Sequence, residues 1–322
     1  MQEQLIKEKV METTMNKKKL IIDTDPGHDD ALAILLMCAA PNIEISAVTT
    51  VAGNSTIQNV TNNAKHILTL AGQPTIPLFS GADKPLLREQ VLANVHGASG
   101  LDGATITEQV PLDGQAVDKI LRIVDENPGE ITLLILGPQT NIAQAIQRDA
   151  KTMQQIKELV IMGGAFDVPG NKNRVAEFNI CVDPDAAAIV AEFPVKKTYI
   201  PLDVCNDIQV PIEEFARIKN DAVRSELQSA LAPYIQNIQR SELSTRGALM
   251  YDALAAYFVM KPKACEVRDE AVVVETKGEF TYGMTLIDKR PFSKKESANA
   301  QIVTFISEQQ FIDDYFETLN TQ

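Results

Sequence analysis

The sequence predicts an α/β fold: an open, mostly parallel, Rossmann-like sheet with helices on both faces, plus a C-terminal helical and β-hairpin elaboration. Short apolar runs alternate with longer stretches of helical periodicity, as in βαβ units joined by right-handed crossovers. The apolar runs are continuous rather than alternating, as expected for strands covered on both faces. A change of rhythm after about residue 211 predicts the elaboration.

The first two thirds of the chain contain the expected βαβ units. Two of the apolar runs end in glycine, and the last helical stretch begins with Asp-Pro, which favours a helix start because proline suits the first helical position. We expect strands at 20–23, 43–51, 131–137 and 158–164, and helices at 28–40, 56–72, 141–147 and 183–193.

Two regions depart from this alternation. Residues 80–115 form a polar stretch rich in Gly, Asp and Pro, and loops of this length in compact domains are usually functional or mobile. Residues 211–247 have a helical pattern, and residues 266–275 and 280–288 predict a β-hairpin. Because no linker or internal repeat is evident, we expect one domain over residues 18–322, preceded by a flexible leader at 1–17.

The net charge of −13 argues against nucleic-acid and anionic-membrane binding, both of which need basic patches. No apolar run approaches the roughly 20 residues of a spanning helix, and the charged N-terminus does not resemble a secretory signal. We therefore expect a cytoplasmic protein. The four cysteines lack CxxC spacing and the three histidines lack HExxH, so neither a disulfide framework nor a zinc site is expected.

The stretch DTDPGHDDA, residues 23–31, places four aspartates at the end of the first expected strand, where ligands bind in open α/β sheets. Helix capping explains Asp29 or Asp30, but it does not explain Asp23 and Asp25 as well. Carboxylates this close repel one another unless a cation lies among them. An all-oxygen set favours calcium or magnesium, and the spacing is not that of an EF-hand.

DTDPGHDDA also resembles the N-terminal motif of the nucleoside hydrolases, the inosine-uridine-preferring N-ribohydrolases. Further blocks resemble that family in its order, over residues 20 to about 260. They are TTVAGN (49–54), LGPQTNIA (136–143), VIMGGAF (160–166), GN (170–171), AEFNICVDPDAA (176–187) and YDALA (251–255).

The resemblance implies a calcium-dependent hydrolysis of the N-glycosidic bond of ribonucleosides to free base and ribose. The calcium ligands would be Asp25, Asp30, the backbone carbonyl of Thr140, and Asp252. Asp25 would also be the general base that takes a proton from the attacking water. Asp23 would lie behind these ligands and orient them.

The ribose hydroxyls would be held by Asp29, Asn54, Glu177 and Asn179, with Asn171 and Met162 lining the sugar pocket. We expect Glu177 and Asn179 on one face of an extended segment, with Phe178 pointing away. Because the 2′-hydroxyl would bind the metal, 2′-deoxynucleosides should be poor substrates.

The chain departs from many family members at the leaving-group side. Tyr251 stands where many members have histidine, and a phenol with a pKa near 10 is a poorer acid. An aromatic residue there implies a preference for purines. His96, in VHGASGLDG, matches a second histidine of some members and is a candidate acid. We expect His28 to be a solvated turn residue and His66 to be structural.

Other readings stay open at this point. A catalytically silent nucleoside- or ribose-binding protein is the main alternative, and a magnesium phosphohydrolase is suggested by Asp23-Thr24-Asp25, although no partner motif follows. HGASG does not form GxSxG, which makes a serine hydrolase remote. Family members are commonly dimers or tetramers, so the resemblance implies a homodimer or homotetramer. The 80–115 loop and the helical segment near 225–250 are expected to close over bound nucleoside.

Overall fold

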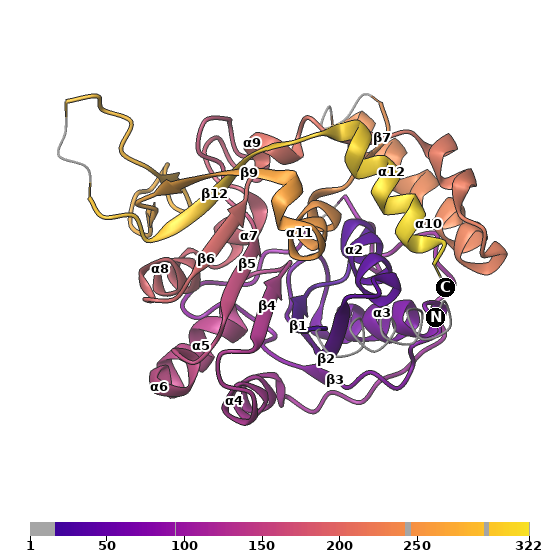
Figure 1. The fold of residues 1–322 in the computed structure, drawn as a ribbon, viewed down its shortest axis with the longest axis horizontal. Helices are drawn as coiled ribbons and strands as arrows, with labels where there is room; N and C mark the ends of the chain where they lie inside the picture. The colour runs from indigo at the N-terminus through magenta and orange to yellow at the C-terminus, as the bar shows by residue number, and fades with distance from the viewer. Residues whose placement is uncertain (1–16, 94, 242–245, 293–295, 322) are drawn as a thin grey trace, which may run out of the picture.

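The structure is a computed structural model that describes residues 17–93, 95–241, 246–292 and 296–321. The predicted leader, apart from Lys17, lies outside the described residues. An eight-stranded sheet runs through the middle of the molecule (Figure 1). In spatial order its strands are β3 (Leu78–Ser80), β2 (Ile43–Thr50), β1 (Lys18–Thr24), β4 (Ile131–Ile135), β5 (Glu158–Met162), β6 (Lys197–Ile200), β12 (Ala300–Ile306) and β9 (Cys265–Glu270).

All neighbouring strands of this sheet pair in parallel except β12 and β9, which are antiparallel. The order of the first strands, β3-β2-β1-β4-β5-β6, reverses direction at β1. This is the topological switch point at which open α/β sheets form ligand crevices. The predicted α/β fold class is confirmed.

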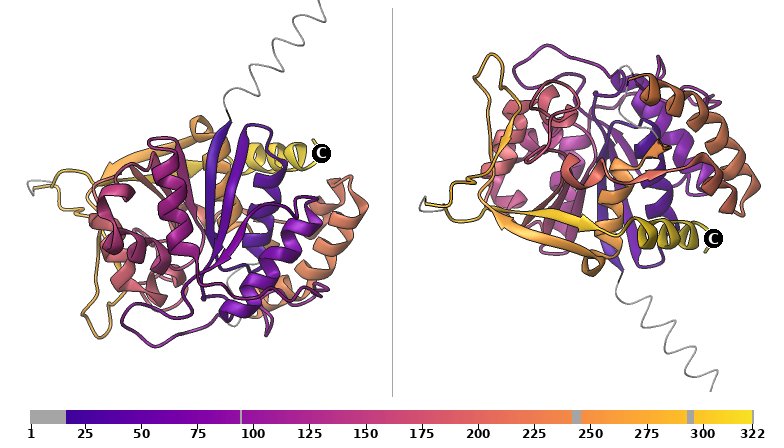
Figure 2. Two further views of the ribbon diagram at one scale, coloured as in Figure 1. Left: turned by 90° about the horizontal axis from the view of Figure 1, so that it is seen from below. Right: turned by 90° about the horizontal axis from the view of Figure 1, so that it is seen from above.

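Helices cover both faces of the sheet, which forms the middle layer in the views of Figure 2. Alternation along β1 explains the two cores: Leu20 and Ile22 join one hydrophobic cluster, and Ile21 joins the other. The first cluster includes α2 (His28–Ala39), α3 (Ile57–Leu70), α10 (Asp221–Arg240), α11 (Tyr251–Met260) and α12 (Glu308–Leu319). The second includes α4 (Ala116–Glu126), α5 (Thr140–Arg148), α6 (Ala150–Met153) and α8 (Pro184–Glu192).

Helices α2 and α11 are buried on nearly every side, because they pack on each other as well as on the sheet. Their sequences, HDDALAILLMCA and YDALAAYFVM, are apolar all round after an acidic first turn, as expected for interior helices. This packing brings the start of α11 next to the start of α2. Short elements complete the chain: α7 (Phe178–Val182), α9 (Leu202–Cys205), β7 (Gln209–Val210), η1 (Ile212–Arg217), β8 (Ala248–Leu249), η2 (Pro262–Ala264), β10 (Val273–Val274) and β11 (Thr285–Leu286).

The predicted C-terminal hairpin is present, but its paired part is shorter than expected. Its first arm is divided: β9 pairs with β12 at the edge of the main sheet, and only the two-residue strands β10 and β11 pair with each other. Six residue pairs join β9 to β12, whereas two join β10 to β11. Most strand residues of the predicted first arm therefore belong to the main sheet. Within the described residues, no helix is long and apolar enough to cross a membrane.

Candidate active site

Asp25 lies in the turn between β1 and α2, and its side chain is fully buried. Its Oδ2 accepts a hydrogen bond from the backbone N–H of Asn54 (2.6 Å), while its Oδ1 has no hydrogen-bond partner among the described residues. A Cβ at Gly53 or Gly137 would overlap this carboxylate. Glycines beyond the ends of β2 and β4 therefore leave the space that Asp25 fills.

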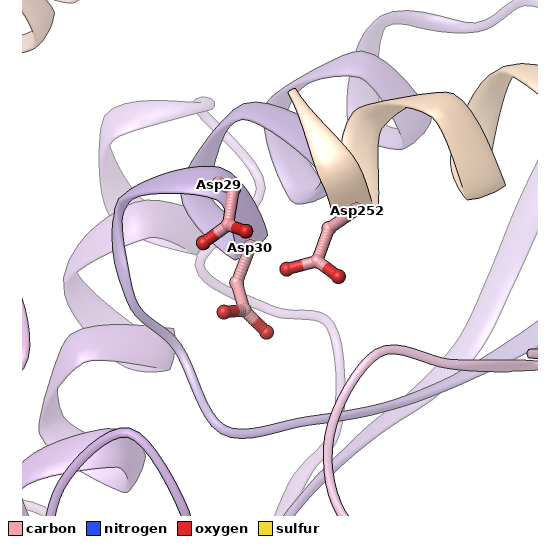
Figure 3. Close-up of side chains that lie close together, drawn as sticks. All are labelled: Asp29, Asp30 and Asp252. Carbon is pink, nitrogen blue, oxygen red and sulfur yellow. The ribbon is translucent and has the colours of Figure 1, made fainter. Parts of the chain in front are cut away.

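Asp29 and Asp30 lie in the first turn of α2, and Asp252 is the second residue of α11. Figure 3 shows their carboxylates gathered between the two helix starts, and one oxygen of each lies within 4.8 Å of the others. Asp30 accepts hydrogen bonds from the Thr24 hydroxyl, the Gly27 N–H (2.9 Å) and the Asn54 amide (3.1 Å). The helix-start carboxylates thus come from opposite ends of the sequence.

These carboxylates have no compensating lysine or arginine within the described part of the chain. Burial, reinforced by the charge of Asp30, raises the pKa of Asp29 to about 8. The same two causes raise the pKa of Asp25 and of Asp252 well above the usual range. Since Oδ1 of Asp25 and Oδ1 of Asp29 are also buried without hydrogen-bond partners, the group fits a bound cation.

Asp23 lies in β1, two residues before Asp25, and Thr140 lies three residues after Gly137. Asp23 accepts hydrogen bonds from the Thr49 hydroxyl (2.5 Å) and the Asn141 amide (2.8 Å), which ties the end of β1 to β2 and to α5. Thr140 is the first residue of α5, and its hydroxyl donates to Asp183 (2.7 Å). These hydrogen bonds hold the start of α5, which follows the loop that contains Gly137.

A cavity of about 290 Å³ opens beside the carboxylates. Eight of the twelve residues predicted for the site line it, and Asp25, Asp30, Thr140 and Glu177 do not. The predicted residues that line it are Asp29, Asn54, His96, Met162, Asn171, Asn179, Tyr251 and Asp252. Residues that were not predicted to line the site complete the wall: Ala93, Val95, Leu136, Lys172, Phe178, Tyr234, Ile238 and Leu249.

The extended geometry expected around Glu177 was wrong. Glu177 is the N-cap of α7 and accepts hydrogen bonds from the N–H groups of Asn179 (2.8 Å) and Ile180 (3.1 Å). The glutamate side chain accepts hydrogen bonds from the first turn, and this favours a helix start over an extended segment. Phe178 consequently lines the cavity instead of pointing away. Burial raises the pKa of Glu177 to about 7, and the Asn179 amide donates to the Leu136 carbonyl (2.7 Å).

Tyr251 is buried at the start of α11, and its hydroxyl donates to the Asn206 side chain (2.7 Å). Burial and nearby acidic groups raise the pKa of this phenol further above its ordinary value. A phenol in this setting keeps its proton and is a weaker acid than in water.

The prediction of a solvated His28 was wrong, because the side chain is only 1% exposed. The rings of His28, His96 and Tyr234 are nearly parallel and mutually stacked, with centroid separations of 5.3, 4.7 and 5.3 Å. Nε2 of His96 lies 3.8 Å from Oδ1 of Asp29. His66, expected to be structural, contacts Glu108 and Glu226 away from the cavity.

Comparisons with known proteins identify this architecture. Residues 20–313 match the family model "inosine-uridine preferring nucleoside hydrolase". A pyrimidine-specific ribonucleoside hydrolase, RihA, of Salmonella agona is 37% identical over 93% of this chain and 97% of its own. An uncharacterized protein of Schizosaccharomyces pombe is 38% identical over 84% of this chain and 89% of its own.

Solved structures agree. A plant nucleoside hydrolase superimposes with a TM-score of 0.87 at 29% identity, covering 94% of this chain and 99% of that chain. A purine-preferring ribonucleoside hydrolase from Gardnerella vaginalis gives a TM-score of 0.87 at 26% identity, covering 94% and 98%. The fold is therefore that of a hydrolase that acts on N-glycosyl bonds. The chain belongs to the inosine-uridine preferring nucleoside hydrolase family and is a ribonucleoside hydrolase.

Proposed function

We propose that this enzyme hydrolyses ribonucleosides with the help of a calcium ion held by Asp25, Asp30, the carbonyl of Thr140, and Asp252. The observation that supports it best is the buried carboxylate group without a compensating lysine or arginine among the described residues. Calcium accepts carboxylate and carbonyl oxygens in a flexible geometry, which suits ligands from a turn and three helix starts.

When bound, the ion would lower the pKa of a water molecule and orient it toward the sugar. Asp25 takes a proton from the attacking water, since its Oδ1 has no hydrogen-bond partner among the described residues and its Oδ2 accepts from the Asn54 N–H. The water oxygen bonds to C1′ as the C1′–N bond breaks and its electron pair goes to the base. The base gains one proton and Asp25 releases one, so nucleoside and water become base and ribose.

Asp29, Asn54, Glu177 and Asn179 bind the ribose hydroxyls in this proposal. Asp29, Asn54 and Asn179 line the cavity. Glu177 does not line the cavity but caps the first turn of α7, which carries Asn179, and Asn171 and Met162 complete the sugar pocket. Buried carboxylates beneath the sugar also stabilise the positive charge that develops on the ring. We expect 2′-deoxynucleosides to be poor substrates.

On the leaving-group side, His96 and Tyr251 flank the base. Nε2 of His96 lies beside Asp29, at the cavity wall, and we assign it the hydrogen bond to the departing base. Tyr251 contributes an aromatic face, because its hydroxyl is engaged by Asn206.

We propose that pyrimidine ribonucleosides are the preferred substrates. The relative with a pyrimidine-specific name is 37% identical, whereas the purine-preferring structural neighbour is 26% identical. The purine preference expected from Tyr251 is the other outcome of the same measurement. We further propose that residues 18–322 act as one catalytic domain in a homodimer or homotetramer, which sedimentation of the purified enzyme would test.

The decisive experiment is a reducing-sugar assay on uridine, cytidine, inosine, guanosine and adenosine, with calcium and after exhaustive chelation. We expect ribose release that chelation abolishes and that calcium restores, fastest with uridine or cytidine. Magnesium at the same concentration is the comparison ion. Folded, calcium-loaded protein that releases no ribose from any of the five would overturn the proposal, and faster release from inosine would reverse the base preference.

A further inference from the structure

His28 is the one buried histidine of the described residues that the mechanism above does not use. It is the first residue of α2, and it contacts His96 twice. Its backbone N lies 3.3 Å from Nδ1 of His96, and its own ring Nδ1 lies 3.1 Å from the same atom. Gly27 permits this approach, because a Cβ there would lie 2.8 Å from Nδ1 of His96.

The backbone contact determines which nitrogen of His96 carries the hydrogen. An N–H group can only donate, so Nδ1 of His96 is an acceptor. The hydrogen of the neutral ring then sits on Nε2, the nitrogen beside Asp29. His96 therefore presents an N–H donor to the cavity. Burial and the neighbouring His28 lower the pKa of His96 well below its ordinary value, which agrees with a neutral ring.

The side chain of His28 stacks on His96 and is itself fixed by neighbouring groups. Its ring stacks on His96 and on Tyr234 at interplanar angles of 19° and 9°. Its Nε2 lies 3.1 Å from the Asp102 carbonyl, and the Asp102 carboxylate accepts hydrogen bonds from Ser99 and Ala98. The neutral ring of His28 carries one hydrogen, on either Nδ1 or Nε2. The hydrogen bond from the His28 backbone N–H to Nδ1 of His96 does not depend on which of the two carries it.

We propose that His28 is a positioning residue that orients His96 so that its Nε2–H points at the departing base. The inference rests on the proposed function, in which His96 contacts the base. As the C1′–N bond breaks, negative charge develops on the base, and a preoriented N–H donor stabilises it. A carbonyl oxygen or ring nitrogen next to the broken bond is the acceptor that fits this donor.

The test compares two substrates whose leaving groups differ. Uridine needs a stabilised base, whereas p-nitrophenyl β-D-ribofuranoside releases a stable anion without help. In His28→Phe the ring stacking is retained and both nitrogens are lost. We expect kcat on uridine to fall about tenfold or more, KM to change little, and kcat on the p-nitrophenyl riboside to stay within about threefold. His66→Gln, which alters a histidine away from the cavity, is the control.

A double-mutant comparison tests the route. If His28 acts through His96, His28→Phe should have little further effect on uridine hydrolysis in the His96→Gln background. The inference would be overturned if His28→Phe lowered kcat equally on both substrates or left kcat on uridine unchanged. It would also be overturned if His28→Phe lowered kcat on uridine by the same factor in the His96→Gln background as in the wild type. Should His28→Phe not fold, His28→Gln is measured in the same way. Failure of the wild-type enzyme on both substrates would instead count against the proposed function.

Discussion

At the scale of single residues, Asp25 has the most constrained position in the site. Its carboxylate fills the space above two glycines, and one oxygen has no partner among the described residues. We expect Asp25→Asn to lower kcat about a thousandfold or more, since the amide cannot take a proton from water. Ribose release at saturating calcium measures the loss. Asp125→Asn, on the exposed side of α4, is the matched control, and a variant at Asp25 that keeps a tenth of the activity would refute the assignment.

In contrast to Asp25, we expect substitution of Tyr251 to change kcat only a little. Because its hydroxyl is engaged by Asn206 and its pKa is raised, Tyr251→Phe should keep kcat on uridine within about tenfold. The variant should lose about 1 kcal/mol of unfolding free energy, since one buried hydrogen bond is removed. Steady-state kinetics and urea unfolding measure the two effects. A loss of a hundredfold or more in kcat, with KM unchanged, would make Tyr251 the acid after all.

At this scale the fold brings together many of the residues that the motifs predicted for the site, and their roles stay predictions. Eight predicted residues line the cavity, because the aspartates and asparagines occur in blocks that mark strand ends. The prediction failed for His28, whose burial depends on Tyr234 and Asp102. Nothing local to DTDPGHDDA indicates that these residues pack over the turn.

At the scale of secondary-structure elements, Lys197 joins three of them. This lysine of β6 is 1% exposed, and its ammonium donates to the carbonyls of Ala191 (3.0 Å), Phe193 (2.6 Å) and Asn299 (3.2 Å). It thereby ties the end of α8 to the segment before β12. The residue lies at the amino end of β6, away from the cavity.

We expect Lys197→Met to lower the unfolding free energy by about 2–4 kcal/mol, because two buried carbonyls and one partly buried carbonyl lose a charged donor. Urea unfolding at neutral pH measures the change, and kcat should be unaltered. Lys196→Met, at an exposed neighbour paired with Glu158, should cost less than about 1 kcal/mol. Equal effects at the two positions would show that the carbonyl contacts contribute little.

Elements with strong periodicity were predictable, and elements set by distant pairing were not. The strands at β1, β2, β4 and β5 and their helices lie close to the expected ranges, because apolar runs bounded by glycine or polar turns leave few alternatives. The pairing of β9 with β12 was missed. Its partner is more than thirty residues further along the chain, and local patterns carry no information about that choice.

At the scale of the whole molecule, the buried acids make metal-free protein sensitive to pH. The folded pKa values of Glu177 and Asp29 are about 7 and 8, against ordinary values of 4.5 and 3.8. Between those values the folded state binds more protons than the unfolded state, so stability falls as pH rises. We expect the unfolding midpoint of chelated protein to drop between pH 5.5 and 8.

Thermal unfolding with chelator, and with calcium, measures this slope. Calcium at about a hundred times its dissociation constant should add about 2.7 kcal/mol and flatten the slope, because it compensates the ionised carboxylates. A midpoint that rises with pH in chelator, or one that calcium leaves unchanged, would argue against a cation site among these acids. The fold class was predictable at this scale from strand and helix alternation alone, since such a pattern favours one kind of sheet.

The meeting of α2 and α11 has a consequence for biosynthesis. Asp25 and Asp30 leave the ribosome early, whereas Asp252 belongs to a helix made near the end of translation. The strand β12, which lies between β6 and β9, follows later still. The nascent chain therefore cannot gather the carboxylate group until α11 has been made and has packed on α2.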